Sequence, residues 1–304
     1  MQRSSAISLT TISLMSAIPV GQVLFAKYTP PAAAVLVLWD HCLTFDEEVA
    51  DMWKCFEGHI VTKIVYIMNR YFTEVVMLYT AYGSCQCFRT PALLPIRPKF
   101  SHGRSHGQRG HCAKMFWLFI MSAIVLASIS QSFIMISTYR LWDHKPNVRK
   151  MLPVVFVISV AGAFVLSVMS VLILLRTQIE VPHKVIVCAV TGVPKTLPST
   201  MGILLVFNLL VILVSVYNAL ENPRGSESDV FSSLRSHSTR VYLIVSLLCV
   251  LLLITSLVAE IQIFFPTLIL ASALKANLTS RMHLRIERLS YTLHPVVIYA
   301  GQEE

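Results

Sequence analysis

The chain has 304 residues, of which 55% are hydrophobic and 13% are charged. Soluble domains carry roughly 25% charged residues, so this composition excludes an ordinary soluble protein and indicates a membrane protein. The net charge of +9 does not indicate a nucleic-acid partner, because the Lys and Arg residues lie in loops between apolar segments, where they set the topology or meet anionic lipid headgroups.

Residues 1–28 contain no acidic residue and are rich in Ser and Thr, as in signal and transit peptides. The hydroxyl residues Thr11, Ser13 and Ser16 interrupt the apolar stretch on which such peptides depend. We therefore expect a disordered leader before the first membrane span, with a cleaved targeting peptide as the alternative.

Apolar segments recur along the rest of the chain, and a helix needs roughly 20 apolar residues to cross a bilayer. They predict an all-α fold, a polytopic membrane bundle of about seven transmembrane helices. The predicted spans are Thr29–Phe45, Ile60–Tyr82, Met115–Thr138, Leu152–Leu175, Pro198–Leu220, Val241–Ala259 and Ile261–Leu274. Proline is tolerated in the first helical turn, which predicts helix starts at Pro30, Pro31, Pro153 and Pro198. Little more than Glu260 separates the last two spans, so one kinked span is the alternative to two helices.

The stretch VLVLWDHCLTFDEEVADMWK, residues 35–54, changes from apolar to acidic within a few residues. Thr44 followed by Glu47 has the spacing of a capping box, in which the hydroxyl and the carboxylate each bond a free backbone N–H at a helix start. This spacing predicts a short helix after Thr44 that lies in the membrane interface, with Trp53 at headgroup depth. A helix that docks a partner protein is the alternative.

Arg70 and Glu74 lie four positions apart in the second span, and therefore on one face of a helix. Charges at membrane depth are costly unless they pair or reach water. We therefore expect an intramembrane ion pair between Arg70 and Glu74, with Asp40 as a third member. A proton or substrate pathway would use the same residues and is the alternative. We expect His41, next to Asp40, to be an interfacial hydrogen-bonding residue.

Residues 83–113 are basic and rich in Pro, Gly, Arg and His, which predicts a disordered loop. Its candidate metal ligands are His102, His106, His111 and Cys112. Their spacing matches no common site, so we expect no bound metal. Residues 114–280 are expected to complete the transmembrane bundle, and residues 281–304 to form a cytosolic tail.

Lys and Arg are more frequent in cytosolic loops than in outside loops. With Arg89 to Arg109 of the basic loop set aside, their distribution favours an outside N-terminus by about two to one. This topology places the C-terminus in the cytosol, together with Lys275 just beyond the last predicted span. The glycosylation pattern that begins at Asn277 also falls on the cytosolic side, where it would stay unmodified.

The sequence contains no GxSxG, HExxH, P-loop or GxGxxG motif in the context that each requires. These motifs mark hydrolase, metalloprotease and nucleotide-binding sites. We therefore expect no catalytic residue, no cofactor-binding residue and no enzyme activity.

Two stretches, WDHCLTFDEEVADMW and NRY, resemble a family of fungal, chiefly basidiomycete, multi-pass membrane proteins that share an N-terminal domain of unknown function, DUF6533. The resemblance places that domain at residues 29–82. The residues that carry it are Asp40, Leu43, Thr44, Glu48, Val49, Trp53, Asn69, Arg70 and Tyr71. It implies seven helices in a receptor-like topology, with an outside N-terminus and a cytosolic C-terminus, but no established activity.

The same resemblance implies a disulfide between Cys112 and Cys188. It also reveals a departure, because the family usually carries Arg in the third-span motif where Ser137 stands here, and this chain has Arg140 one turn later. The basic segment of residues 85–111 is a second departure from the family pattern.

The sequence thus predicts an integral membrane protein of uncharacterised function, with a receptor-like sensor or signalling component as the favoured role. A small-solute or ion transporter and a structural membrane scaffold are the alternatives. The expected partners are the lipid bilayer, an unidentified ligand and a cytosolic signalling protein, without nucleic acid. The sequence does not distinguish the plasma membrane from an endomembrane.

Overall fold

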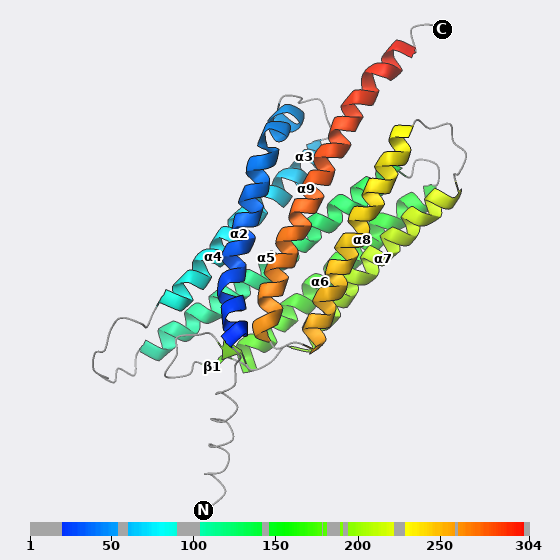
Figure 1. Cartoon of the computed structure of the whole chain (residues 1–304). Helices are drawn as coiled ribbons and strands as arrows, with labels where there is room; N and C mark the ends of the chain where they lie inside the picture. Colours follow the sequence, from blue (N-terminus) through cyan, green and yellow to red (C-terminus); the bar gives the residue numbers. More distant parts are fainter. Residues whose placement is uncertain are drawn as a thin grey trace, which may run out of the picture.

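The computed structural model describes residues 20–53, 60–89, 104–141, 146–177, 179–180, 189–190, 194–221, 229–258 and 261–300. These residues are almost entirely helical, as the apolar segments predict. Figure 1 shows the helices lying side by side as a bundle, with the start of α2 at one end and the end of α9 at the other.

The first part of the described chain forms two helical rods, each of which contains a π-helical turn. The first rod consists of α2 (Val20–Glu48) and the π-helical turn η1 (Val49–Trp53). The second consists of α3 (Ile60–Ile67), the π-helical turn η2 (Met68–Phe72) and α4 (Thr73–Arg89). Each of the first two rods thus contains a π-helical turn of five residues.

Five longer helices follow. They are α5 (Arg104–Leu141), α6 (Pro146–Thr177), α7 (Thr196–Glu221), α8 (Asp229–Val258) and α9 (Ile261–Ala300). Two short strands, β1 (Ile179–Glu180) and β2 (Ala189–Val190), pair antiparallel between α6 and α7. Each of α6, α7 and α8 packs against the next helix along the chain, and α9 also packs against α2, which places the first and last of the described helices side by side.

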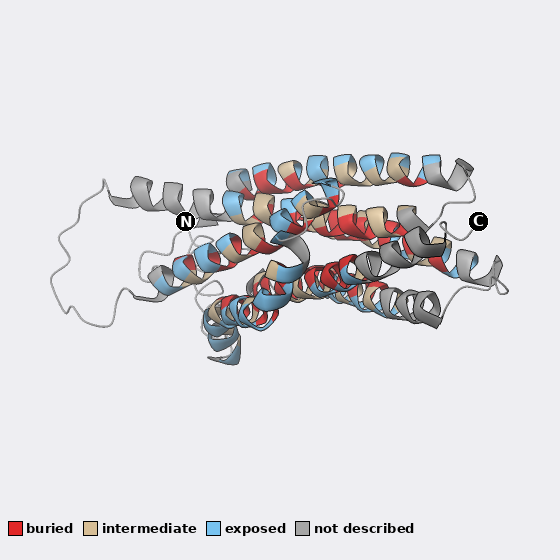
Figure 2. Ribbon diagram, turned by 90° about the horizontal axis from the view of Figure 1, so that it is seen from above, coloured by how far each residue is buried: buried red, intermediate tan, exposed pale blue. Residues whose placement is uncertain are grey.

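Within the described residues, five helices are long and apolar enough to cross a membrane. Their spans are Trp117–Tyr139, Lys150–Leu174, Thr196–Tyr217, Thr239–Val258 and Ile263–Arg288. This result supports a multi-pass membrane protein, and spans through α2 and through α3–α4 stay predictions. Figure 2 shows the buried residues on the faces where helices meet and the exposed residues on the outer faces. Many outer residues are large and apolar, such as Val35, Ile158, Leu213 and Leu247, which suits contact with lipid.

The first helix differs from its predicted form at both ends. It begins at Val20 rather than Thr29, so residues 20–28 are helical and do not belong to a disordered leader; residues 1–19 lie outside the described part of the chain. Pro30 and Pro31 therefore lie inside α2. Proline is tolerated inside membrane helices because neighbouring groups can satisfy the freed carbonyls. Pro153 likewise lies inside α6, whereas Pro198 is in the first turn of α7 as predicted.

The predicted helix start at Thr44 is wrong. The chain stays helical through this position to Trp53. The Thr44 hydroxyl donates backward to the Asp40 carbonyl at 2.9 Å, as hydroxyls do inside helices, and does not cap a following turn. No separate interfacial helix begins at Thr44, because α2 continues through this residue and the Thr44 hydroxyl is hydrogen-bonded within α2.

The segment predicted as a disordered basic loop, residues 83–113, is partly helical. Helices include residues 83–89 and 104–113, and residues 90–103 lie outside the described part. Residues 281–300 continue α9, and the cytosolic location of residues 281–304 stays a prediction. The helices α8 and α9 pack against each other, which confirms two helices there and excludes one kinked span.

Candidate functional site

The first helix presents a row of polar side chains to the interior of the bundle. Asp40, Thr44 and Glu48 follow one another at intervals of four residues, so they lie on one face of α2. All three are buried, and Glu48 is completely buried. The row faces the second rod and α9, both of which pack against α2 or its π-helical turn.

The π-helical turn η2 places two neighbouring residues, Asn69 and Arg70, inside the bundle together. A regular α-helix turns about 100° per residue, and a π-helical turn changes this rotation locally, which is why such turns often lie at functional sites. Arg70 consequently reaches α2 while Asn69 reaches α9.

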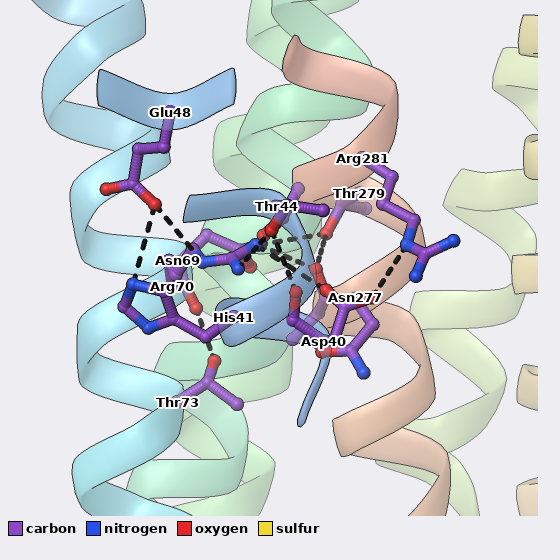
Figure 3. Close-up of polar contacts among 12 residues, drawn as sticks. Asp40, His41, Thr44, Glu48, Asn69, Arg70, Thr73, Asn277, Thr279 and Arg281 are labelled. Carbon is purple, nitrogen blue, oxygen red and sulfur yellow. Dashed lines mark hydrogen bonds and ion pairs between the residues drawn. The ribbon is translucent and has the colours of Figure 1, made fainter. Parts of the chain in front are cut away.

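The Arg70 guanidinium lies between two carboxylates of α2 (Figure 3). Its Nη1 is 3.5 Å from Asp40 Oδ2, and its Nε is 3.4 Å from Glu48 Oε2. Its Nη2 donates to the Thr44 hydroxyl. Arg70 is 4% exposed, so this pairing keeps a buried cation from being uncompensated, which would cost several kcal/mol.

Glu48 is the most heavily coordinated acid of the site. Its Oε1 accepts from the Tyr71 hydroxyl at 2.7 Å and from the Trp53 indole N–H at 3.4 Å. Its Oε2 accepts from the Tyr66 hydroxyl at 3.0 Å. With Arg70 as a further partner, both carboxylate oxygens are occupied by groups of the protein itself.

His41 lies between two carboxylates. Its Nδ1 is hydrogen-bonded to Glu74 Oε1, and its Nε2 is 3.7 Å from Glu48 Oε2. Figure 3 shows His41 next to Glu48 and close to Arg70. Both ring nitrogens therefore face carboxylate oxygens, one of Glu74 and one of Glu48. His41 thus links an acid of the second rod to an acid of the first rod.

The last helix completes the site from the other end of the chain. Arg281 Nε is 2.6 Å from Asp40 Oδ1, and the Arg281 side chain is half exposed. The Asn69 amide donates to Thr279 Oγ1 at 2.9 Å and to Ser280 Oγ at 3.1 Å. Its carbonyl oxygen accepts from the Ser130 hydroxyl of α5 at 3.2 Å. Asn69 thus joins the second rod to α5 and α9.

We call six ionisable residues the charge cluster: Asp40, His41, Glu48, Arg70, Glu74 and Arg281. Three are acids, two are arginines, and the sixth is His41, which contacts two of the acids. Charge balance matters here because an unpaired ion is costly in the interior of a membrane bundle. The cluster is therefore a network in which acids lie next to basic residues, and not a set of isolated charges.

The predicted ion pair between Arg70 and Glu74 is not formed. Each residue has a different partner: Arg70 binds Asp40 and Glu48, and Glu74 binds His41. The physical reason is the turn η2, because the four-residue rule assumes regular α-helical rotation and Arg70 belongs to a π-helical turn. The expected participation of Asp40 agrees with its contact to Arg70.

Most of the residues that carried the family resemblance meet at this site. Asp40, Thr44, Glu48, Trp53, Asn69, Arg70 and Tyr71 make the contacts described above. Leu43 is instead 58% exposed, and Val49 makes no polar side-chain contact. The sequence interpretation missed His41 as a bridge and missed the contribution of α9. The polar row with a spacing of four on an apolar helix was the available signal.

Two further predictions concern residues near or outside the described parts. The side chain of Cys112 and all of Cys188 lie outside the described residues, so the disulfide stays a prediction, and Cys42, Cys85 and Cys249 are free thiols.

The glycosylation pattern at Asn277 lies on α9. Its Thr279 is buried and hydrogen-bonded to Asn69, and the pattern falls within the candidate span Ile263–Arg288.

A small cavity of about 140 Å³ borders the charge cluster. It is lined by Glu48, Trp53, Ile60, Lys63, Ile64, Tyr66 and Ile67. Apolar side chains form most of its wall, and the oxygens of Glu48 are already hydrogen-bonded. The cavity therefore provides little polar surface for an ion or a polar solute.

These features define an integral, multi-pass membrane protein whose buried charges connect its first, second and last helical rods. Residues 28–73 match the family described as a family of unknown function, DUF6533. This match supports the resemblance, and it covers all the residues of the cluster from Asp40 to Arg70. No curated protein and no solved structure matches the chain.

Proposed function

We propose that this protein is a receptor-like sensor or signalling component of a membrane, and that the charge cluster holds its resting conformation. The family resemblance points to a fungal membrane. The observation that carries the proposal is that the cluster joins three rods, through contacts of Asp40 with Arg70 and with Arg281. A sensor needs two conformations of similar free energy, and a stimulus selects one of them.

Such a cluster is suited to switching because its contacts differ in strength. Arg70 is buried between Asp40 and Glu48, whereas Arg281 is half exposed and approaches Asp40 from the rim. Exposed ion pairs contribute only about 0–1 kcal/mol, so the contact with α9 can open while the buried contacts persist. Opening would let α9 move relative to α2, and α9 is the helix that carries the C-terminal residues.

The alternative is a transporter of protons or small ions. One observation favours it, because His41 bridges Glu48 and Glu74 as a proton-carrying group would. Against it, the cavity beside Glu48 is mostly apolar, and a pathway needs several polar stations. A structural scaffold, the third candidate, would need only one conformation.

Two measurements on the purified full-length protein separate these roles. In liposomes that contain a pH-sensitive dye, a potassium diffusion potential should drive no proton flux above that of empty liposomes. Flux that Glu48→Gln abolishes and Glu47→Gln preserves would establish a transporter and overturn the proposal.

Hydrogen–deuterium exchange in lipid nanodiscs tests the conformational role. We expect Arg281→Gln to expose a second, faster-exchanging population in α2 and α9. Arg285→Gln is the matched control, because Arg285 is an exposed arginine one turn further along the same helix. A single population in both variants, unchanged from the wild type, would favour the scaffold and contradict the sensor.

A further inference from the structure

The cavity of about 140 Å³ that borders the charge cluster opens toward the outer surface of the bundle. Four of its lining residues belong to α3 and are spaced by three or four positions, so they lie on one face of this helix: Ile60, Lys63, Ile64 and Ile67. The three isoleucines are exposed, Ile60 at 70%. Trp53 lines the cavity from the first rod and is also exposed. The cavity therefore lies between the first two rods, and its apolar opening suits contact with lipid.

Two buried side chains, Glu48 and Tyr66, form the inner wall of the cavity. Tyr66 donates its hydroxyl hydrogen to Glu48 Oε2 at 3.0 Å, and the Trp53 indole N–H donates to Glu48 Oε1 at 3.4 Å. Glu48 therefore fixes both aromatic side chains through their polar atoms and leaves the apolar surfaces of their rings to the cavity. An apolar cavity of about 150 Å³ admits a molecule as large as benzene, so this one has room for a short length of hydrocarbon chain.

Lys63 adds a positive charge to the wall of this apolar cavity. It is partly buried, as expected for a lysine whose hydrocarbon stem lies against apolar groups while its ammonium extends toward headgroups. It lies in the first turn of α3, which begins at Ile60 shortly after the first rod ends at Trp53. A tryptophan and a lysine at the ends of membrane helices are typical of headgroup depth. The cavity thus combines an apolar wall with a cation where lipid headgroups are expected.

We propose that this cavity binds one anionic phospholipid, with part of an acyl chain between Trp53 and α3 and the phosphate at Lys63. The proposal does not rest on the sensor role. The apolar wall selects a hydrocarbon chain, and Lys63 selects a negative charge. A zwitterionic headgroup carries a cation that offsets its phosphate, so an anionic headgroup binds more tightly. The predicted topology places this end of the bundle on the cytosolic side, and the cytosolic leaflet is the one that carries anionic lipids.

The proposed lipid site shares residues with the charge cluster. Glu48 lines the cavity and also lies 3.4 Å from the Arg70 guanidinium. A chain in the cavity packs against Trp53 and Tyr66, and it therefore holds two of the hydrogen-bond donors of Glu48 in place. Lipid binding at this site thus acts on a carboxylate that joins the first rod to the second.

Fluorescence quenching by lipids with brominated acyl chains tests which lipid contacts Trp53. The full-length protein is placed in phosphatidylcholine liposomes that contain a minor fraction of one brominated lipid, and the emission of Trp53 is the difference between the wild type and Trp53→Phe. We expect brominated phosphatidylglycerol to quench Trp53 more strongly than the same fraction of brominated phosphatidylcholine. Lys63→Gln should remove this excess, whereas Lys150→Gln, at an exposed lysine of α6, should keep it. Equal quenching of the wild type by the two lipids would mean ordinary bilayer contact and would overturn the proposal.

Native mass spectrometry tests the affinity and the place of the chain. Titration of the detergent-solubilised full-length protein gives the dissociation constant of the tightest phosphatidylglycerol molecule. Lys63→Gln should weaken it by about fivefold, as expected for one lysine near an anionic surface.

A second pair of variants keeps the test decisive if Lys63→Gln fails to fold. Ile64→Trp fills the cavity and should abolish tight binding although Lys63 is still present. Val61→Trp is the matched control, because Val61 is exposed on the same helix and does not line the cavity. Wild-type affinity in Ile64→Trp, or the same loss in both variants, would show that the chain does not occupy the cavity.

Discussion

Arg281 on α9 and Asp40 on α2 are 241 positions apart in the chain, yet the Arg281 Nε lies 2.6 Å from the Asp40 Oδ1. The contact joins the last helix to the first. Asp40 also binds Arg70 of the second rod, so one carboxylate is shared by cations from two different helices. Loss of either arginine removes a cation from Asp40, so the effects of the two substitutions on stability can be compared directly.

We expect Arg70→Met to destabilise the protein by about 3–5 kcal/mol, because it leaves the buried carboxylates of Asp40 and Glu48 without their shared cation. Arg281→Met should cost only about 0–1 kcal/mol, since Arg281 is half exposed and its pairing is screened. Steric-trapping unfolding in bicelles measures both free energies. Equal losses would mean that burial does not set the strength of these contacts.

Glu47 and Glu48 are neighbours that differ in burial, and they form a matched pair. Glu48→Gln should cost about 2–4 kcal/mol, because it weakens the hydrogen bonds from Tyr66 and Tyr71 and leaves Arg70 with less compensating charge. Glu47→Gln removes only an exposed contact with Arg288 and should change stability by less than about 1 kcal/mol. The same unfolding assay compares them, and a larger effect at Glu47 would contradict the placement of the two acids.

Asn69→Ala should cost about 1–3 kcal/mol, because Thr279 and Ser280 lose their shared donor inside the bundle. Asn277→Ala is the control on α9, since its amide makes one long contact of 3.5 Å with the Leu36 carbonyl, and its loss should cost less than about 1 kcal/mol. Amide exchange should also quicken in α9 in the first variant. Unchanged exchange there would show that Asn69 does not hold α9 in place.

The glycosylation pattern at Asn277 should stay unmodified when the protein is made in a eukaryotic cell, because it lies within the candidate membrane span Ile263–Arg288. Treatment with a glycosidase should therefore leave the electrophoretic mobility of the wild type unchanged. Gln2→Asn creates a new acceptor at Asn-Arg-Ser, residues 2–4, and tests the predicted outside N-terminus. A glycan on this variant confirms the orientation, and a glycan on Asn277 would contradict the burial of α9.

The sequence by itself determined the membrane class, the helical fold and most of the polar residues that matter. Hydropathy is a local property, and an apolar run of sufficient length fixes a helix wherever it lies in the chain. A local sequence pattern gave a wrong prediction where the same residue suits both a helix start and a helix interior. Thr44 has the spacing of a helix start, but it lies within α2, because its hydroxyl is held by the Asp40 carbonyl and by Arg70.

Only the tertiary structure decided which charges meet. Four-residue spacing paired Arg70 with Glu74, but the π-helical turn at residues 68–72 directed Arg70 to α2 and left Glu74 to His41. Arg281 could not be assigned a partner from sequence, because its partner Asp40 lies on another helix. Electrostatic pairing depends on distance in space, and the packing of α9 against α2 sets that distance.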